Sequence, residues 1–209
     1  MSHPESARVL PALPDWLGEG FPAQGSWTYE DYCRIPDDGK RYEVIRGVLH
    51  VSPSPGARHQ RVLMHLLWEL HRYVASKGLG EVLVSPFDVQ LPGLATPIEP
   101  DIIYVSRERA PIVKEPYILG PPDLVVEVLS PSNTRQYLRT RLEVFAEGGI
   151  EECWVVDPDA RRIDVHVREG TLYRLHGSFG ADDTARSKVL GGFEVPVASV
   201  CPDAPESGR

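Results

Sequence analysis

Apolar residues recur three or four positions apart in two segments of this chain, which is the spacing of one face of a helix. The first segment predicts a helix from residue 59 to about residue 76, followed by Gly78 and Gly80, which favour helix termination. The second segment predicts a helix from about residue 134 to residue 147, also ended by glycines. A shorter helix is expected at residues 28–34, because Thr28 can cap its first turn.

Shorter apolar runs, bounded by proline, glycine and charged residues, predict β-strands between and after these helices. The runs cover residues 41–45, 48–51, 98–105, 124–129 and 152–157, with a strand region at 81–91 that breaks at Pro86 and an antiparallel hairpin at 161–167 and 171–175. Arg46-Gly47 separates the first two runs and predicts a hairpin there. Residues 106–122 are charged and rich in proline, so a loop or a poor helix is expected.

The order of these elements predicts an α/β fold, in which helices flank a central mixed β-sheet and β-hairpins lie toward both ends of the domain. The strand–helix–strand unit at residues 124–156 is expected to form a right-handed crossover. With 209 residues, of which 42% are hydrophobic, the chain fits one globular domain. We expect an irregular arm at residues 1–26, the domain at 27–200 and a polar tail at 201–209.

Cysteine usage and hydropathy point to a cytoplasmic protein. Cys33, Cys153 and Cys201 are odd in number and form no CxxC motif, which argues against a disulfide framework or a zinc site. No apolar run approaches the roughly 20 residues that span a membrane. The first residues also lack the basic-then-apolar order of a secretory signal.

The formal net charge of −8 weighs against a general nucleic-acid coat protein, whose affinity comes from neutralising phosphates. It does not exclude a nuclease, because acidic metal ligands add to the negative count and one local basic face suffices for binding. The positive charges are mostly arginines, and the lysines are Lys40, Lys77, Lys114 and Lys188.

Two carboxylates stand next to apolar, strand-like runs, and these are the residues that carry candidate chemistry. Asp101 follows Pro100, and Glu127 lies in the middle of the run at 124–129. Burying such acids is unfavourable unless positive charge lies against them. Two acids brought together repel each other, so a divalent cation such as Mg²⁺, which prefers oxygen ligands, is a natural partner. That is the chemistry of metal-assisted phosphodiester cleavage. Alternatively, Asp101 is a strand-start acid in a Pro-Asp turn.

Three further polar residues each allow two interpretations. Arg141 shares the apolar face of the second helix, where its head either reaches solvent or reaches the carboxylates or a substrate phosphate. Glu43 alternates with apolar neighbours on a short strand, so it is either exposed or part of the same acidic cluster. His59 lies on the apolar stripe of the first helix and fits a core or capping residue better than a ligand.

Several motifs together resemble the Uma-two family of bacterial restriction-endonuclease-like proteins, which belongs to the PD-(D/E)XK nuclease superfamily. They are YEVIRGVL at 42–49, SPSP at 52–55 with His59, Pro100-Asp101, PDLVVEVLSPS at 122–132, GIEECWVVDP at 149–158 and LGGFE at 190–194. The resemblance covers about residues 27–200. It implies a restriction-endonuclease-like core and a site dependent on Mg²⁺, or on Mn²⁺, that acts on nucleic acid, with DNA expected, in a homodimer.

The resemblance also implies roles for individual residues. Asp101 matches the metal-binding aspartate, Glu127 the second acid of the motif, and Glu43 an acid associated with the site. In a metal-dependent enzyme, Asp101 and Glu127 would hold the Mg²⁺ together with the carbonyl of Val128. The superfamily lysine, two residues after the second acid, is Leu129 here. In this branch the lysine lies on the following helix, where Arg141 stands, and an acidic position on the same helix is Tyr137. Arginine stabilises phosphate charge but cannot act as a base.

Three hypotheses follow from this departure. The first is an enzyme, a metal-dependent endonuclease weakened by arginine at the usual lysine place. The second is a catalytically inactive binding or regulatory module that keeps the nuclease fold, as the Arg141 and Tyr137 substitutions and the acidic surface suggest. The third is a protein–protein scaffold whose C-terminal hairpin pairs across a dimer.

Overall fold

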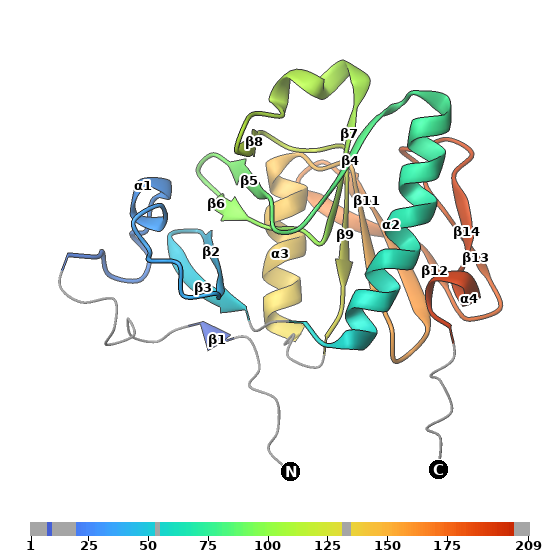
Figure 1. The fold of residues 1–209 in the computed structure, drawn as a ribbon, viewed down its shortest axis with the longest axis horizontal. Coiled ribbons are helices and arrows are strands. Elements are labelled where there is room, and N and C mark those ends of the chain that lie inside the picture. Colours follow the sequence, from blue (N-terminus) through green and yellow to red (C-terminus); the bar gives the residue numbers. More distant parts are fainter. Residues whose placement is uncertain (1–7, 10–19, 53–54, 131–134, 203–209) are drawn as a thin grey trace, which may run out of the picture.

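Two six-stranded mixed β-sheets form the framework of this protein, for which a computed structural model describes residues 8–9, 20–52, 55–130 and 135–202 (Figure 1). The predicted arm and tail lie largely outside these residues, as does the expected start of the second long helix. The α/β class and the mixed pairing are confirmed, but the prediction of one central sheet is wrong. None of the helices in the described segments is long and apolar enough to cross a membrane.

The first sheet contains the parallel strand pair on either side of the second long helix. Its order is β12-β11-β10-β9-β7-β4, with β4 at Gly80–Val84, β7 at Ile102–Ser106, β9 at Leu124–Val128, β10 at Glu152–Asp157, β11 at Arg162–Glu169 and β12 at Leu172–Phe179. Strands β9 and β10 pair in parallel, so that Glu127 lies beside Val155, and the other pairs are antiparallel. The predicted hairpin near the C-terminus is therefore present as β11 and β12.

The second sheet is built around the predicted hairpin near the N-terminus. Its order is β1-β3-β2-β6-β5-β8, with β1 at Arg8–Val9, β2 at Arg41–Ile45, β3 at Val48–Ser52, β5 at Asp88–Leu91, β6 at Ala95–Ile98 and β8 at Tyr117–Leu119. Strands β5 and β8 are parallel. Arg46 and Gly47, with φ of 51° and 72°, form the turn between β2 and β3, as their sequence predicts.

The chain crosses from one sheet to the other at two places where a single strand region was expected. Residues 98–105 are divided between β6 and β7, and residues 81–91 between β4 and β5. Pro86 and Pro100 stand within these two runs. A strand is interrupted there, because proline has no backbone N–H to donate to the ladder of a sheet. The crossing between β6 and β7, at Glu99-Pro100-Asp101, lies at the candidate site. The segment predicted as a loop or poor helix contains a 3₁₀-helix at Arg107–Ile112 and β8.

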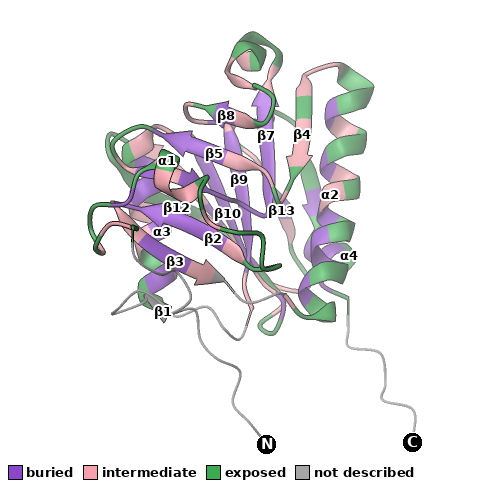
Figure 2. Ribbon diagram, turned by 60° about the vertical axis from the view of Figure 1, so that its left-hand side comes forward, coloured by how far each residue is buried: buried purple, intermediate pink, exposed green. Residues whose placement is uncertain are grey.

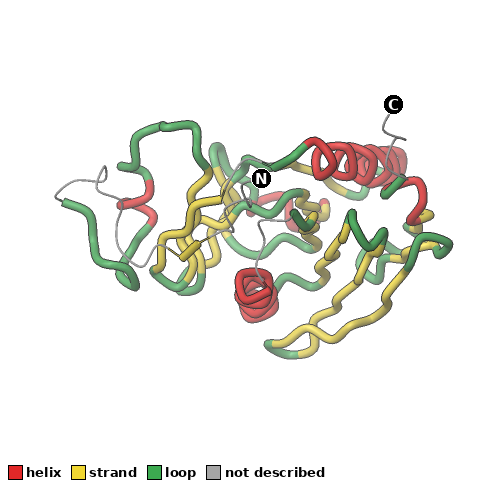
Figure 3. Tube along the Cα trace, turned by 90° about the horizontal axis from the view of Figure 1, so that it is seen from below, coloured by secondary structure: helices red, strands yellow, loops and turns green. Residues whose placement is uncertain are grey.

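Helices cover the two faces of the first sheet. Helix α2, Ala57–Lys77, packs on one face with alternate residues of β7, β9 and β10, and Gly78 ends it in a left-handed conformation. Helix α3, Arg135–Gly148, packs on the other face and contacts residues of the second sheet as well. Viewed end-on, α3 lies between the strands of the two sheets (Figure 3). Because side chains alternate along β9, Glu127 points to the α3 side together with Val125.

Three small elements complete the described fold. Helix α1, Tyr29–Tyr32, is capped by Thr28 as expected, and its Asp31 closes a capping box. A two-stranded ribbon of β13, Thr184–Arg186, and β14, Glu194–Pro196, leads into helix α4, Val197–Val200. The ribbon and α4 were not predicted. They bury apolar residues in the core that they share with α2 and the first sheet. Figure 2 shows the buried positions along strands of that sheet, such as β7 and β9.

Glu152 on β10 holds the segment between β13 and β14 against the first sheet by hydrogen bonds. Its fully buried carboxylate accepts hydrogen bonds from Trp154 Nε1 at 2.6 Å, Ser187 Oγ at 2.7 Å and the backbone N–H groups of Lys188 and Val189 at 2.7 and 2.9 Å. No role was predicted for this residue from the sequence, because its partners from Ser187 to Val189 lie more than thirty residues away and reach it only in the folded chain.

We expect Glu152→Gln to lower the free energy of unfolding by about 1–3 kcal/mol, because an amide nitrogen leaves at least one of these buried donors without an acceptor. Urea unfolding followed by circular dichroism measures the change. Glu194→Gln, which removes a solvent-exposed partner of Arg186, should stay within about 0.5 kcal/mol of the wild type. Equal effects of the two substitutions would show that the hydrogen bonds accepted by Glu152 do not stabilise the fold.

Candidate active site

A guanidinium group on α3 lies between acids from the two sheets. Arg141 Nη1 is 2.6 and 2.7 Å from the two carboxylate oxygens of Glu43 on β2, and Nη2 is 2.6 Å from Glu127 Oε1 on β9. Arg141 is 2% exposed and Glu43 1% exposed. The interpretation in which Arg141 reaches the carboxylates is therefore correct, and those that place Arg141 or Glu43 in solvent are wrong.

Glu43 accepts two further hydrogen bonds. Tyr137, one turn before Arg141 on α3, donates its hydroxyl to Glu43 Oε2, and the backbone N–H of Glu99 donates to Oε1 at 2.6 Å. Arg141 also donates to the Tyr137 hydroxyl at 3.2 Å and to the Glu99 carbonyl at 3.2 Å. Tyr137 and Arg141 thus bind the same carboxylate together, and both oxygens of Glu43 are engaged.

Asp101 lies beside Glu127 at the end of β9. Its Oδ2 accepts the backbone N–H of Val128 at 2.8 Å and lies 3.1 Å from His59 Nε2 at the start of α2. The structure therefore brings Asp101, Glu127 and Val128 together, as the sequence predicts. His59 is buried, in agreement with a core position, but its contact with Asp101 was not foreseen.

Arg41 is a second arginine in the cluster, and its place there was not predicted from the sequence. Arg41 Nε lies 3.1 Å from Glu99 Oε2, its Nη2 donates to the Glu99 carbonyl at 2.9 Å, and its Nη1 is 3.8 Å from Asp101 Oδ1. Two signals were available in the sequence. Arg41 precedes Glu43 by two residues, so both lie on one face of β2, and Glu99 stands directly before Pro100.

The buried cluster carries a surplus of negative charge. It contains the carboxylates of Glu43, Glu99, Asp101 and Glu127 and the guanidinium groups of Arg41 and Arg141, which give a net charge of −2 when all six are ionised. Burial disfavours the charged forms of Glu99 and Glu127, and the protons that these two acids retain reduce the negative charge.

The pKa values follow from burial and from the two arginines. Burial raises the pKa of Glu127 to about 7, with the charge of Asp101 adding to the rise and Arg141 opposing it. Burial likewise raises the pKa of Glu99 to about 7 against the effect of Arg41. For Glu43 burial is outweighed, and the nearby Arg141 and Arg41 lower its pKa. The cluster therefore holds exchangeable protons close to neutral pH.

The arrangement limits which residues a metal ion can use. Among the residues that the structure describes, no group of three or more His, Cys, Asp and Glu side chains is placed to hold a metal ion. Glu43 thus does not join Asp101 and Glu127 in a three-acid metal site, since Arg141 and Tyr137 occupy its oxygens. The smaller set of Asp101, Glu127 and the Val128 carbonyl stays a prediction.

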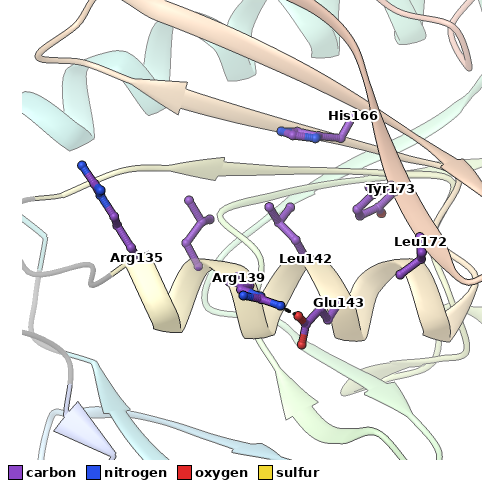
Figure 4. A pocket seen from close by; sticks show the side chains of 8 residues that line it. Arg135, Arg139, Leu142, Glu143, His166, Leu172 and Tyr173 are labelled. Carbon is purple, nitrogen blue, oxygen red and sulfur yellow. Dashed lines mark hydrogen bonds and ion pairs between the residues drawn. The ribbon is translucent and has the colours of Figure 1, made fainter.

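A cavity of about 360 Å³ lies on the other side of α3, away from this cluster (Figure 4). It lies between the helix and the β11–β12 hairpin, and its lining includes Leu138, Leu142 and Tyr173, with Arg139 and Glu143 paired at its rim. None of the predicted site residues lines it. Tyr137 and Arg141 project from α3 toward the buried cluster instead.

Comparison with known proteins agrees with the motifs. The family model Uma2, described as "Putative restriction endonuclease", matches residues 29–198. The chain belongs to the Uma2 family. The family predicted from the sequence motifs is thereby confirmed, and the carboxylate cluster lies within the matched region of this Uma2 chain. No curated protein matches the chain.

A solved structure has a similar fold. It is the crystal structure of a putative nuclease belonging to DUF820 from Anabaena variabilis ATCC 29413, with a TM-score of 0.70 and 16% sequence identity. The alignment covers 83% of this chain and 97% of that one. At this identity the likeness concerns the fold, so the roles of residues in the Uma2 chain are argued from its own geometry.

Proposed function

We propose that this chain is a Mg²⁺-dependent nuclease that hydrolyses phosphodiester bonds of nucleic acid, with DNA as its substrate. The carrying observation is the pair of buried acids Asp101 and Glu127, joined through the Val128 backbone at the end of β9. The cluster that contains these two acids has a net charge of −2 when all six of its groups are ionised, which one divalent cation neutralises. The donor set therefore fits Mg²⁺ or Mn²⁺, both of which prefer oxygen ligands.

Asp101, Glu127 and the Val128 carbonyl would hold the cation. When bound, Mg²⁺ polarises a phosphoryl oxygen and lowers the pKa of coordinated water. Arg141 fixes the carboxylate of Glu127 and contributes positive charge close to the phosphate. Glu43, whose oxygens are engaged by Arg141, Tyr137 and the Glu99 backbone N–H, would act on this site by holding Arg141 in place. Because the pKa of arginine lies far above neutral, Arg141 cannot take the proton of that water.

Cleavage assays test this proposal directly. Plasmid DNA and labelled oligonucleotides are incubated with Mg²⁺ or Mn²⁺ and with wild type, Asp101→Ala or Glu127→Ala. We expect cleavage by the wild type alone, and only when a divalent cation is present. Equal cleavage by all three proteins would show that the activity belongs to a contaminant, and no cleavage by the wild type would contradict the proposal.

A catalytically inactive nuclease-fold module is the second candidate, and the position of Arg141 favours it. The guanidinium bridges Glu43 and Glu127, which reduces the need of these acids for a cation, and Leu129 stands at the usual lysine place. Calorimetry discriminates the two functions, because absence of Mn²⁺ binding at millimolar concentration supports the module. A gain of cleavage in Arg141→Lys would identify the chain as a degenerate nuclease.

Cation affinity should rise as the pH is raised from about 6 to about 8, because a carboxyl group with a pKa near 7 must lose its proton to bind metal. Burial gives Glu127 this property. Calorimetric titration with Mn²⁺ in two buffers of different ionisation enthalpy measures both the affinity and the protons released. Glu127→Gln should weaken this pH dependence and leave the smaller contribution of Glu99, whose pKa is also raised to about 7. A constant affinity between pH 6 and 8 would show that Glu127 is not a ligand.

A homodimer remains a prediction. The edge of the first sheet offers a surface for it, because β12 is the last strand and exposes Leu172 and Leu175. Light scattering at several protein concentrations tests this, and a strictly monomeric chain would contradict it.

A further inference from the structure

The candidate active site contains two arginines, and they differ in the donors that they leave free. Both terminal nitrogens of Arg141 already donate to the cluster, Nη1 to Glu43 and Tyr137 and Nη2 to Glu127 and the Glu99 carbonyl. Its Nε is buried and has no hydrogen-bond partner among the described residues. Because only 3% of its side chain is exposed, Arg141 has no terminal donor to offer to a substrate.

Arg41, by contrast, keeps a terminal nitrogen that its neighbours do not use. Its Nε and Nη2 are directed at Glu99, at 3.1 Å from Oε2 and 2.9 Å from the carbonyl oxygen. Its Nη1 lies 3.8 Å from Asp101 Oδ1, which is longer than a hydrogen bond. Nη1 donates no hydrogen bond to any residue that the structure describes. A nitrogen with two protons is therefore available beside Asp101.

Arg41 is also the charged group of the cluster that is most open to solvent. Its side chain is 26% exposed, whereas the side chains of the other five charged residues are 11% exposed or less. Burial lowers its pKa, but the carboxylates of Glu43, Glu99 and Asp101 outweigh this effect and raise the pKa, so the guanidinium keeps its charge. A phosphate that enters the site from solvent therefore finds Arg41 rather than Arg141.

We propose that Arg41 is a catalytic residue that contacts the phosphodiester to be cleaved. Its Nη1 donates to a non-bridging oxygen of the phosphate beside Asp101 and stabilises the negative charge that grows there. The bond from phosphorus to water forms as the bond to the leaving oxygen breaks, and the proton that water loses is matched by the one that the leaving oxygen gains. Arg41 keeps its own protons throughout. This inference rests on the proposed function, because the phosphate is that of the substrate.

Cleavage and cation binding by matched variants test this role together. Arg41→Gln should lower the initial rate of cleavage of labelled DNA at saturating Mg²⁺ about 100-fold or more, and Arg41→Lys should retain more of the rate because it keeps a positive charge. The calorimetric affinity of Arg41→Gln for Mn²⁺ should equal or exceed that of the wild type, because losing a positive group beside Asp101 does not weaken the attraction for a cation. Arg46→Gln is the matched control. It removes an arginine that pairs with Glu147 in solvent, in the turn after the same strand, and should leave both measurements unchanged.

DNA binding measures the phosphate contact apart from the rate. Fluorescence anisotropy follows labelled DNA, as a duplex and as single strands, in Ca²⁺, which accepts oxygen ligands in a looser geometry than Mg²⁺. A gel verifies that the probe stays intact. Arg41→Gln should raise the dissociation constant about 10-fold and reduce the slope of its salt dependence by about 1, whereas Arg41→Lys should keep the slope. A purely structural role of Arg41 would leave the slope unchanged.

The outcomes separate this inference from the proposed nuclease function. Cation-dependent cleavage at the wild-type rate by Arg41→Gln would retain the nuclease and overturn the role of Arg41, as would a slower rate with weaker Mn²⁺ binding or an unchanged salt slope. DNA binding that depends on Arg41, without cleavage by the wild type, would retain the phosphate contact and reject the nuclease. Neither binding nor cleavage by the wild type would reject both.

The variants are expected to fold. Burial already raises the pKa of Glu99 to about 7, so this acid can take up a proton when Arg41 is replaced. Circular dichroism spectra verify the fold of each protein. If Arg41→Gln does not fold, the comparison of Arg41→Lys with the wild type decides, since an equal salt slope together with a reduced cleavage rate is expected and a wild-type rate with a changed slope would overturn the inference.

Discussion

Replacement of Arg141 by methionine should lower the free energy of unfolding by about 3–5 kcal/mol, because it leaves two buried acids without their cation. Arg141 contacts Glu43 and Glu127 with both terminal nitrogens and is almost completely buried. The lost contacts cannot be replaced by solvent. Denaturant unfolding at about pH 7.5 measures the change, on the assumption of a two-state transition.

The control for this prediction lies on the same helix. Arg139 pairs with Glu143 at 2.8 Å on the exposed face of α3, so Arg139→Met should cost less than about 1 kcal/mol. The deficit of Arg141→Met should also shrink toward about pH 5, because protonated Glu127, whose pKa is already raised to about 7, no longer needs a partner. A similar loss for both variants, or a loss independent of pH, would show that the cluster does not depend on Arg141.

Glu127→Gln should reduce cation-dependent cleavage about 100-fold or more, since loss of several kcal/mol of charge stabilisation by a bound metal has at least this effect on a rate. The substitution keeps the shape of the side chain. The amide oxygen of the glutamine can also still accept the hydrogen bond that Arg141 Nη2 donates to Glu127. The initial rate of oligonucleotide cleavage at saturating Mg²⁺ is the measurement.

Glu152→Gln provides the matched comparison for Glu127→Gln. It changes a buried glutamate on the neighbouring strand β10, but its partners are Trp154 and the segment after Ser187 rather than the cluster. Glu152→Gln should therefore lose stability and keep the cleavage rate of the folded protein. If Glu127→Gln retains wild-type cleavage, or if Glu152→Gln loses as much, the assignment of Glu127 as a metal ligand is wrong.

Local patterns in the sequence predict the helices and most strands, because helix periodicity and apolar runs depend on neighbouring residues. The division of residues 98–105 between two sheets could not be read in this way. Ile98 and Ile102 are both fully buried and apolar, and nothing local shows that they pack in different sheets. Pro100 marks the crossing but is equally compatible with a strand edge.

The candidate site could be predicted where a charged residue stands within or beside an apolar run that is expected to be buried. Glu127 within an apolar strand and Asp101 after Pro100 are such conflicts. Arg41 and Glu99 were missed because each is unremarkable in its own segment, and their contact joins positions 58 residues apart. Their role depends on the path of the chain between the sheets, which residue spacing does not encode.

Tyr137 and Arg141 both donate hydrogen bonds to Glu43, and this arrangement has an evolutionary consequence. Because the phenol and the guanidinium touch each other as well as the same carboxylate, the two positions cannot drift separately. A carboxylate at 137 would set a second negative group against Glu43 and break the hydrogen bond that Tyr137 supplies. Relatives with arginine at the place of 141 should therefore carry a hydrogen-bond donor at the place of 137, and an acid at 137 should be found with a different residue at 141.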